Sequence, residues 1–180
     1  MLKDQLGDSQ MNLLTLLSIL VLLLGVISCG FLGDIPHQTD AEMVENFRLH
    51  RADFENLLAM IRDDESKIGK RLYRIDYDWT EPKDLGALGI SDERVREYRS
   101  LFPKIGVPRG FYAYGEDDVY MFVASTQGIA VSGTSKSYVW RPEPPSLLAN
   151  EELQEYVRRN NLGRAYRHIE GNWYLEFEGD

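Results

Sequence analysis

Small, hydroxyl-bearing and basic residues gather around Lys136 at a spacing that resembles a phosphate-binding loop. Gly128 and Gly133 are separated by four residues, and Lys136 follows the second glycine. Such a loop needs Lys and then Ser or Thr directly after that glycine, so that the ammonium group and backbone amides converge on phosphate. Thr134 and Ser135 occupy those two positions instead. The pattern therefore favours a hairpin turn between two strands.

Two carboxylates lie two residues apart, at Asp76 and Asp78, in a strand-like segment. Alternate residues of a strand project from one face, so the pair has the spacing of a general acid and base or of two calcium ligands. The further oxygen ligands and the glycine of a calcium loop do not follow. We therefore interpret the pair as part of a solvated strand face.

The histidines and the cysteine predict no metal site. His37, His50 and His168 are far apart in the sequence, and Cys29 is the only cysteine. A four-cysteine zinc site is therefore excluded, and no two histidines have the spacing of ligands on one helix. We expect no cofactor and identify no catalytic residue. His168 lies among aromatic residues, which favours a hydrogen-bonded core histidine.

Aromatic residues on the predicted strands suggest one candidate binding surface. Tyr138 and Trp140 follow the predicted turn, next to Ser135 and Lys136. Loops and exposed rings on a rigid sheet commonly recognise ligands or partners, so these four residues are the candidate binding residues. Core packing is the competing interpretation, because sheets favour aromatic residues in any case.

The composition is that of a globular, acidic protein. Of the 180 residues, 43% are hydrophobic and 27% are charged, and the net charge is −9. This balance excludes a collagen, a coiled coil and a wholly disordered chain. A strongly acidic chain repels polyanions, so we expect no nucleic-acid partner.

The N-terminal part has the pattern of an export signal. An almost unbroken apolar run spans Leu13–Ile27, and Ser28 and Cys29 follow it. This arrangement resembles the lipobox of bacterial lipoproteins. The resemblance implies cleavage between Ser28 and Cys29, and acylation of Cys29 by lipid chains such as palmitate, which hold the protein on the membrane.

The same resemblance implies a place in the cell envelope. Gly30 and Phe31 follow the cysteine, whereas an Asp there tends to retain such proteins in the inner membrane. We therefore expect a lipid-anchored protein on the outer membrane that faces the periplasm. An uncleaved, single-pass span in the inner membrane over Leu13–Leu32 remains the alternative, since Lys3 is the only cation before the apolar run and translation could begin at Met1 or Met11.

The boundaries expected from these patterns are a signal peptide over 1–28, an acylated cysteine and tether over 29–38, and one domain over 39–180. The domain is predicted to begin with a helix from Asp40 to Arg62, because a capping box precedes apolar residues at helical spacing. Two shorter helices are expected after Ser91 and Asn150, the first ending before Pro103.

The pattern in the rest of the domain predicts an antiparallel β-meander. The expected fold class is therefore α+β, with this sheet packed against the long N-terminal helix and the two short helices at its connections. The expected strands are Arg71–Trp79, Gly110–Tyr114, Val119–Ser125, Ile129–Ser132, Ser137–Arg141, Ala165–Glu170 and Trp173–Glu178.

A Gly-Asn dipeptide at 171–172 predicts a two-residue hairpin loop between the last two strands. This loop would pair Tyr166 with Phe177 in the core and Arg167 with Glu176 on the surface.

For function, the patterns favour a lipid-anchored envelope protein that acts through protein contact. A binding module for a small ligand or glycan and an exported hydrolase are the alternatives. The sequence motifs include neither a nucleophile with its base nor a cluster of metal ligands, so the enzyme hypothesis is disfavoured.

Overall fold

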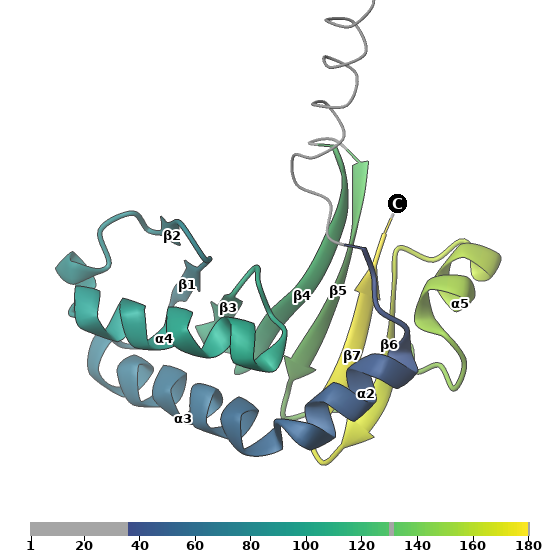
Figure 1. Cartoon of the computed structure of the whole chain (residues 1–180), viewed down its shortest axis with the longest axis horizontal. Helices are drawn as coiled ribbons and strands as arrows, with labels where there is room; N and C mark the ends of the chain where they lie inside the picture. The colour runs from purple at the N-terminus through teal and green to yellow at the C-terminus, as the bar shows by residue number, and fades with distance from the viewer. Residues whose placement is uncertain (1–35, 130–131, 180) are drawn as a thin grey trace, which may run out of the picture. The chain divides into compact units, whose positions relative to one another are not determined.

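Seven strands form one antiparallel sheet in the order β2-β1-β3-β4-β5-β7-β6 (Figure 1). The computed structural model describes residues 36–129 and 132–179, and these form an α+β fold, as predicted. The strands are β1 (Leu72–Ile75), β2 (Thr80–Glu81), β3 (Phe111–Tyr114), β4 (Val119–Ile129), β5 (Ser132–Trp140), β6 (Arg164–Glu170) and β7 (Trp173–Glu178). The predicted meander holds only from β3 to β5, because the chain then crosses to the outer strand β6 and returns as β7.

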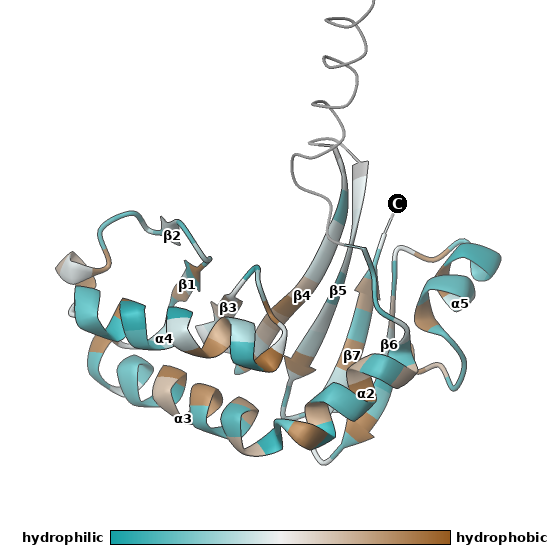
Figure 2. Cartoon of the chain, in the orientation of Figure 1, coloured by the Kyte–Doolittle hydropathy of each residue, from teal (hydrophilic) through white to brown (hydrophobic). Residues whose placement is uncertain are grey.

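Helices cover one face of the sheet. The α-helices are α2 (Asp40–Leu49), α3 (Arg51–Ile68), α4 (Asp92–Ile105) and α5 (Leu153–Asn160), with short 3₁₀ turns η1 (Gly86–Leu88) and η2 (Gly115–Asp117). Figure 1 shows α2, α3 and α4 in front of the strands, and α5 beside β6. Figure 2 shows that α4 is mostly hydrophilic toward the viewer, whereas β7 carries hydrophobic residues.

The predicted helix from Asp40 to Arg62 is two helices, which meet at His50. The capping box forms as expected: the Thr39 side chain accepts from the Glu42 N–H, and the Glu42 carboxylate accepts from the Thr39 N–H at 2.8 Å. At His50 the backbone leaves the helical region (φ −113°, ψ 19°). Apolar residues keep helical spacing on both sides of this break, so the periodicity alone did not reveal it.

Helix α4 begins as predicted but ends later. The Ser91 hydroxyl caps it by accepting from the Arg94 N–H at 3.2 Å. Pro103 lies inside the helix, and the chain leaves it only at Gly106, which has the positive φ of a C-cap. A proline near the end of a helix removes one hydrogen bond without stopping the last turn. Helix α5 begins at Leu153, three residues after the predicted cap.

The core lies between the helices and the sheet face that they cover. Large side chains from both layers are fully or almost fully buried there, including Phe47, Phe54, Tyr98, Phe102, Tyr73, Phe111, Phe122, Tyr138, Trp173 and Phe177. Edge-to-face ring contacts join them; the Phe54 and Phe122 rings lie 6.2 Å apart at 88°. We call the other side of the sheet, which none of the described helices covers, the open face.

Strands β4 and β5 run through the segment predicted as a turn. Ser135, Lys136 and Ser137 are paired strand residues, opposite Thr126, Ser125 and Val123. The predicted hairpin turn is therefore wrong. Strand β4 continues past the predicted end at Ser125 to Ile129, and Ser132, the predicted end of the next strand, begins β5. Small and hydroxyl-bearing residues suggest a turn in isolation, but the long partner strand keeps them extended.

The C-terminal hairpin has its predicted two-residue turn but a different register. Glu170 pairs with Trp173, and a β-bulge directly after this pair shifts the remaining partners by one residue. Tyr166 therefore pairs with Glu176 on the open face, and the predicted pairing of Arg167 with Glu176 is wrong. A one-residue shift of this kind exchanges the two faces of a strand.

The predicted signal peptide, with Ser28 and Cys29, lies outside the described residues. Among the residues that the structure describes, none of the helices is long and apolar enough to cross a bilayer.

Candidate functional site

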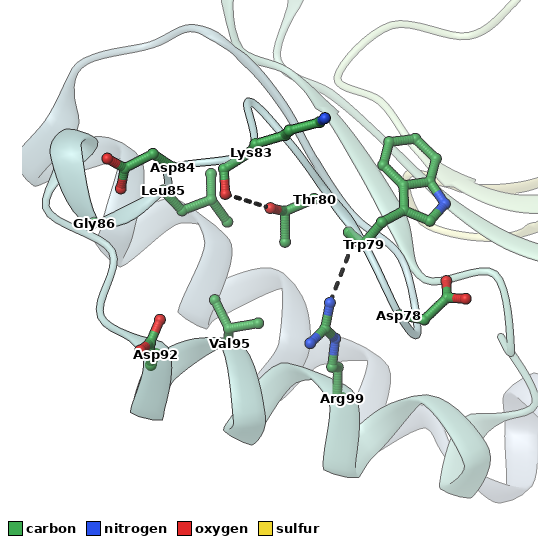
Figure 3. A pocket seen from close by; sticks show the side chains of 10 residues that line it. All are labelled: Asp78, Trp79, Thr80, Lys83, Asp84, Leu85, Gly86, Asp92, Val95 and Arg99. Atoms are coloured by element: carbon green, nitrogen blue, oxygen red, sulfur yellow. Dashed lines mark hydrogen bonds between the residues drawn. The ribbon is translucent and has the colours of Figure 1, made fainter.

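A cleft of about 840 Å³ opens between α4 and the loop that follows β2 (Figure 3). We call it the Trp79 cleft. Its lining residues are Asp78, Trp79, Thr80, Lys83, Asp84, Leu85, Gly86, Asp92, Val95 and Arg99. Leu85 and Val95 are buried and give the cleft an apolar floor, while charged side chains stand around it. Its lining therefore combines an apolar surface with hydrogen-bonding groups, as ligand sites do.

The predicted strand Arg71–Trp79 is interrupted, and this interruption creates the cleft. The Asp76 N–H donates to the Trp79 carbonyl at 2.9 Å, which closes a tight turn between β1 and β2. Helix α4 holds the turn in place, because the Arg99 guanidinium donates to the carbonyls of Asp76 at 3.0 Å and Trp79 at 3.3 Å. Figure 3 shows the Arg99 side chain reaching from the helix to the loop.

The Trp79 ring is oriented by its neighbours. The Arg74 guanidinium carbon lies 4.0 Å from the centroids of both the Trp79 ring and the Tyr112 ring. Asp76 is fully buried and fixes Arg74 through an ion pair of 3.1 Å. Stacked and ion-paired in this way, Arg74 supports one face of an indole that remains 39% exposed. The ring is therefore positioned before any ligand arrives.

Asp76 and Asp78 do not act as the pair that their spacing suggested. Asp76 lies outside the cleft lining and is fully buried beside Arg74, whereas Asp78 is exposed at the rim. The turn between β1 and β2 breaks the strand alternation that would have placed them on one face.

The cleft has charged groups of both signs, and all of them except Arg99 are exposed. Its three carboxylates belong to Asp78, Asp84 and Asp92, and its two cations to Lys83 and Arg99. All three carboxylates are exposed to solvent, so each keeps water that a ligand could replace. The mixture suits hydrogen bonds to a neutral, polar ligand better than it suits a phosphate or another polyanion.

A second group of charged residues, two of them fully buried, surrounds the start of the domain. We call it the Lys136 cluster, made of Lys136, Asp40, Glu152 and Arg167. The Lys136 ammonium lies 2.6 Å from carboxylate oxygens of both Asp40 and Glu152 and donates to the Gln38 carbonyl at 2.6 Å. Lys136 and Asp40 are both fully buried. Such an arrangement is stable only when each charge has a partner.

Asp40 connects this cluster to α5 and to β6. Its carboxylate accepts from the Leu153 N–H at 3.0 Å, the first residue of α5, and lies 3.4 Å from the Arg167 guanidinium. Its own N–H donates to the Glu152 carboxylate at 2.9 Å. Burial raises the pKa of Asp40 and outweighs the hydrogen bond and positive charge of Lys136, which lower it. The cluster thus ties the first described segment to three elements that are distant in sequence.

His37 is fastened beside the Lys136 cluster. Its two ring nitrogens each lie 2.7 Å from a hydroxyl, Nδ1 from Ser125 and Nε2 from Thr134, and its ring meets Phe177 edge to face at 5.4 Å. Burial, and then the positive charge of Lys136, lower the pKa of His37. A neutral imidazole is therefore favoured here.

The contact between His37 and Ser125 resembles half of a catalytic triad, but it does not have a triad's geometry. Ser125 is buried, and both ring nitrogens of His37 are occupied by hydroxyls. A catalytic nucleophile must be accessible to its substrate, and it needs a neighbouring base that a third group orients. The pair therefore fits a structural role.

The residues predicted to bind a ligand do not form a surface. Lys136 and Tyr138 are fully buried, and Trp140 is partly buried beneath the Arg62 guanidinium, 3.9 Å from its ring centroid. The Tyr138 hydroxyl accepts from the Asn46 amide at 2.9 Å, and burial raises its pKa to about 12. Ser135 and Trp140 remain partly exposed, whereas Lys136 and Tyr138 do not, because β5 is a central strand whose alternate residues enter the core.

The remaining histidines do not meet at a common site. His168 is exposed rather than in the core, with Nε2 3.0 Å from the Gly171 carbonyl. His50 lies 3.7 Å from Asp53 at the junction of α2 and α3. Within residues 36–129 and 132–179, the structure brings together no group of His, Asp and Glu side chains suited to a metal ion.

Comparisons with known proteins provide no further guidance, because no family model, curated protein or solved structure matches this chain. The functional argument therefore depends on the geometry of the sites themselves.

Sequence patterns did not identify the cleft. Its residues come from β2 and the turn before it, an irregular loop, a 3₁₀ turn and one helix, and only Asp78 belonged to a pattern noted in the sequence. The one available signal was the irregular segment 80–90, since loops on a rigid scaffold commonly carry function.

Proposed function

We propose that this chain is a lipid-anchored cell-envelope protein whose domain binds a saccharide in the Trp79 cleft. The single observation that supports binding is the cleft itself, with a preoriented, exposed indole beside carboxylates and cations. A tryptophan ring packs against the apolar face of a sugar, and charged side chains hydrogen-bond to its hydroxyls.

The balance of charge favours this ligand class over others. Three carboxylates and two cations leave the lining near neutrality, so neither a polyanion nor a polycation gains strongly from it. The exposed charges are hydrated in the free protein, and hydroxyl groups replace such water with little loss of hydrogen bonding. A sugar is therefore the best chemical match.

Binding can be measured through the Trp79 ring. Trp173 is buried and Trp140 is covered by Arg62, so Trp79 is the indole most accessible to a ligand among the three tryptophans. Titration of the full-length chain in detergent micelles with a β-1,4-linked N-acetylglucosamine tetramer should shift its fluorescence. A glucose tetramer of the same linkage serves as the probe that lacks acetamido groups.

The Trp79→Ala variant should lose at least tenfold in affinity for the preferred tetramer, because the stacking surface is removed. Tyr77→Ala is the matched control, since Tyr77 is an exposed aromatic residue in the same turn but outside the cleft lining. Equal affinities of wild type and Trp79→Ala, measured by calorimetry, would contradict the proposal.

Anchoring through Cys29 is the second part of the proposal. Support comes from the sequence alone: a lone cysteine after an apolar run and a small residue. Several acyl chains make attachment effectively permanent, whereas a single chain gives only marginal binding. The Cys29→Ala variant should therefore accumulate as an unprocessed, unlipidated precursor.

Labelling cells with a fatty-acid analogue and weighing the N-terminal peptide tests the anchor. The wild type should be shortened and acylated at Cys29. An intact, unacylated start at Met1 or Met11 would contradict lipidation and favour the transmembrane span instead.

Protein contact is a second candidate function. Leu72 and Tyr114 are exposed and pair across β1 and β3, and Tyr77 is exposed nearby in sequence. Crosslinking in cells followed by mass spectrometry would identify such a partner, and crosslinks at Leu72 or Tyr114 would favour this function over saccharide binding.

A further inference from the structure

Aliphatic side chains from separate parts of the chain meet in the Trp79 cleft. Leu85 lies in the loop before η1 and Val95 on α4, and they are 4% and 8% exposed. Figure 3 shows both side chains directed into the space between the loop and the helix. Sugar hydroxyl groups find no hydrogen-bond partner on such a surface, so a ring that carries only hydroxyl groups leaves this part of the cleft unmatched.

Thr80, on β2, adds a methyl group to the same surface. Its hydroxyl donates to the Lys83 carbonyl at 3.2 Å and is therefore already used within the loop. Figure 3 shows this hydrogen bond, with the Thr80 methyl group turned toward α4. We call Thr80, Leu85 and Val95 the aliphatic centre of the cleft. It suits an apolar group of a ligand.

Helix α4 places a polar group on each side of Val95. Asp92, Val95 and Arg99 follow one another at intervals of three and four residues, which puts them on one face of the helix. All three line the cleft. A carboxylate only accepts hydrogen bonds, and a guanidinium group only donates them. The helix therefore presents an acceptor, an apolar group and a donor in sequence.

Both polar groups can still bind a ligand. The Arg99 guanidinium uses Nε and Nη2 for the carbonyls of Asp76 and Trp79, and Nη1 has no hydrogen-bond partner within the described part of the chain. The Asp92 carboxylate is exposed, and it has neither an ion pair nor a hydrogen bond to any other residue that the structure describes.

We propose that the saccharide bound in the Trp79 cleft carries an acetamido group. Its N–H donates to the Asp92 carboxylate, its carbonyl oxygen accepts from Arg99, and its methyl group packs against the aliphatic centre. An acetamido group has these three parts and no charge, so it also suits the mixed charges of the lining. This inference rests on the proposed saccharide binding and names the class of sugar.

Three β-1,4-linked tetramers that differ only at carbon 2 of each sugar test the proposal. N-acetylglucosamine carries the acetamido group there, glucose a hydroxyl group and glucosamine an amino group. Each would be titrated by calorimetry into the full-length chain in detergent micelles. The acetylated tetramer should bind at least tenfold more tightly than either of the others, because they leave the polar groups and the aliphatic centre unmatched.

Asp92→Ala should weaken binding of the acetylated tetramer at least fivefold and change the affinity for the glucose tetramer less than twofold. Glu93→Ala is the matched control, because Glu93 is also an exposed acidic residue in the first turn of α4 but lies outside the cleft lining. It should change both affinities less than twofold. Both variants remove one negative charge from the same helix end, so their difference reports the contact with the sugar.

Val95→Thr tests the apolar contact, since it exchanges one methyl group for a hydroxyl group of similar size. It should lower the preference for the acetylated over the glucose tetramer at least threefold. Asp92 is exposed, so its variant tests the proposal even where Val95→Thr fails to fold.

Equal affinities for the acetylated and glucose tetramers, or equal losses in Asp92→Ala and Glu93→Ala, would overturn acetamido recognition and leave saccharide binding intact. Tighter binding of the glucosamine tetramer would also overturn it, in favour of attraction between amino groups and the carboxylates. Binding of none of the three tetramers would overturn both this inference and the proposed function.

Discussion

The Lys136 cluster and the Trp79 cleft contain the same kinds of charged residue in opposite surroundings. In the cluster, Lys136 and Asp40 are fully buried and bonded to one another and to the backbone. In the cleft, Asp78, Asp84 and Asp92 are exposed to solvent. The residue types are alike, so composition does not distinguish the two regions.

The difference shows how burial decides what a charge can do. A buried ion has lost its water, so its partners inside the protein are obligatory and hold the structure together. An exposed ion keeps its water and can exchange it for a ligand. We therefore assign stability to the cluster and recognition to the cleft, and the following variants test that division.

Lys136→Met should give the largest loss of stability. Removing the ammonium group leaves Asp40 and Glu152 close together, with only the partly exposed Arg167 to compensate them. Breaking a buried pair costs about 3–5 kcal/mol of unfolding free energy. Urea unfolding of the full-length chain in micelles measures it.

Lys104→Met is the control for that variant. Lys104 forms a pair of 2.7 Å with Asp53, but the lysine is exposed, and such a pair contributes under about 1 kcal/mol. Similar losses in the two lysine variants would break the comparison, since burial would then make no difference.

His37→Gln should give a smaller loss, about 1–2 kcal/mol at pH 7.5, because two hydrogen bonds to hydroxyls are weakened. The variant should also change the pH dependence. Burial and Lys136 lower the folded-state pKa of His37, so below about pH 6.5 the unfolded chain binds a proton that the folded domain does not.

The contribution of His37 is therefore full above about pH 6.5 and is lost as pH falls through that value toward the folded-state pKa. Urea unfolding at several pH values should show a steeper loss in the wild type than in His37→Gln. The same slope in both proteins would show that His37 does not titrate on unfolding.

Trp79→Ala should have the smallest effect on stability, within about 1 kcal/mol, because the indole is partly exposed at the rim of the cleft. The same variant should nevertheless lose at least tenfold in affinity for the saccharide. A loss of stability as great as that of Lys136→Met would show that the ring is part of the core and would remove the contrast between the two regions.

The sequence predicted elements better than it predicted their surroundings. The Thr39 and Ser91 caps and the strand Trp173–Glu178 are local patterns, and the structure contains them. The burial of Lys136 was not predictable, because it depends on Asp40 and Glu152, which meet it only in the fold. A lysine beside serines indicates a solvated turn unless those partners are known.

The bulge between β6 and β7 shows how one local irregularity changes a functional prediction. A regular hairpin placed Glu176 on the surface opposite Arg167, whereas the shifted register buries it opposite Tyr166. The break between β1 and β2 acts in the same way: it buries Asp76 and exposes Asp78. Both irregularities interrupt the two-residue alternation of a strand, so the pattern along the sequence did not reveal them.

The most direct test of the division between the two regions is a map of where a saccharide binds. Backbone and indole N–H signals of the ¹⁵N-labelled full-length chain in micelles would be followed by NMR during titration with the tetramer that binds more tightly. The account predicts shifts at Trp79, in the loop after β2 and in the first turns of α4, with none at His37, Asp40 or Lys136. Shifts centred on the Lys136 cluster, with the Trp79 signal unchanged, would contradict it.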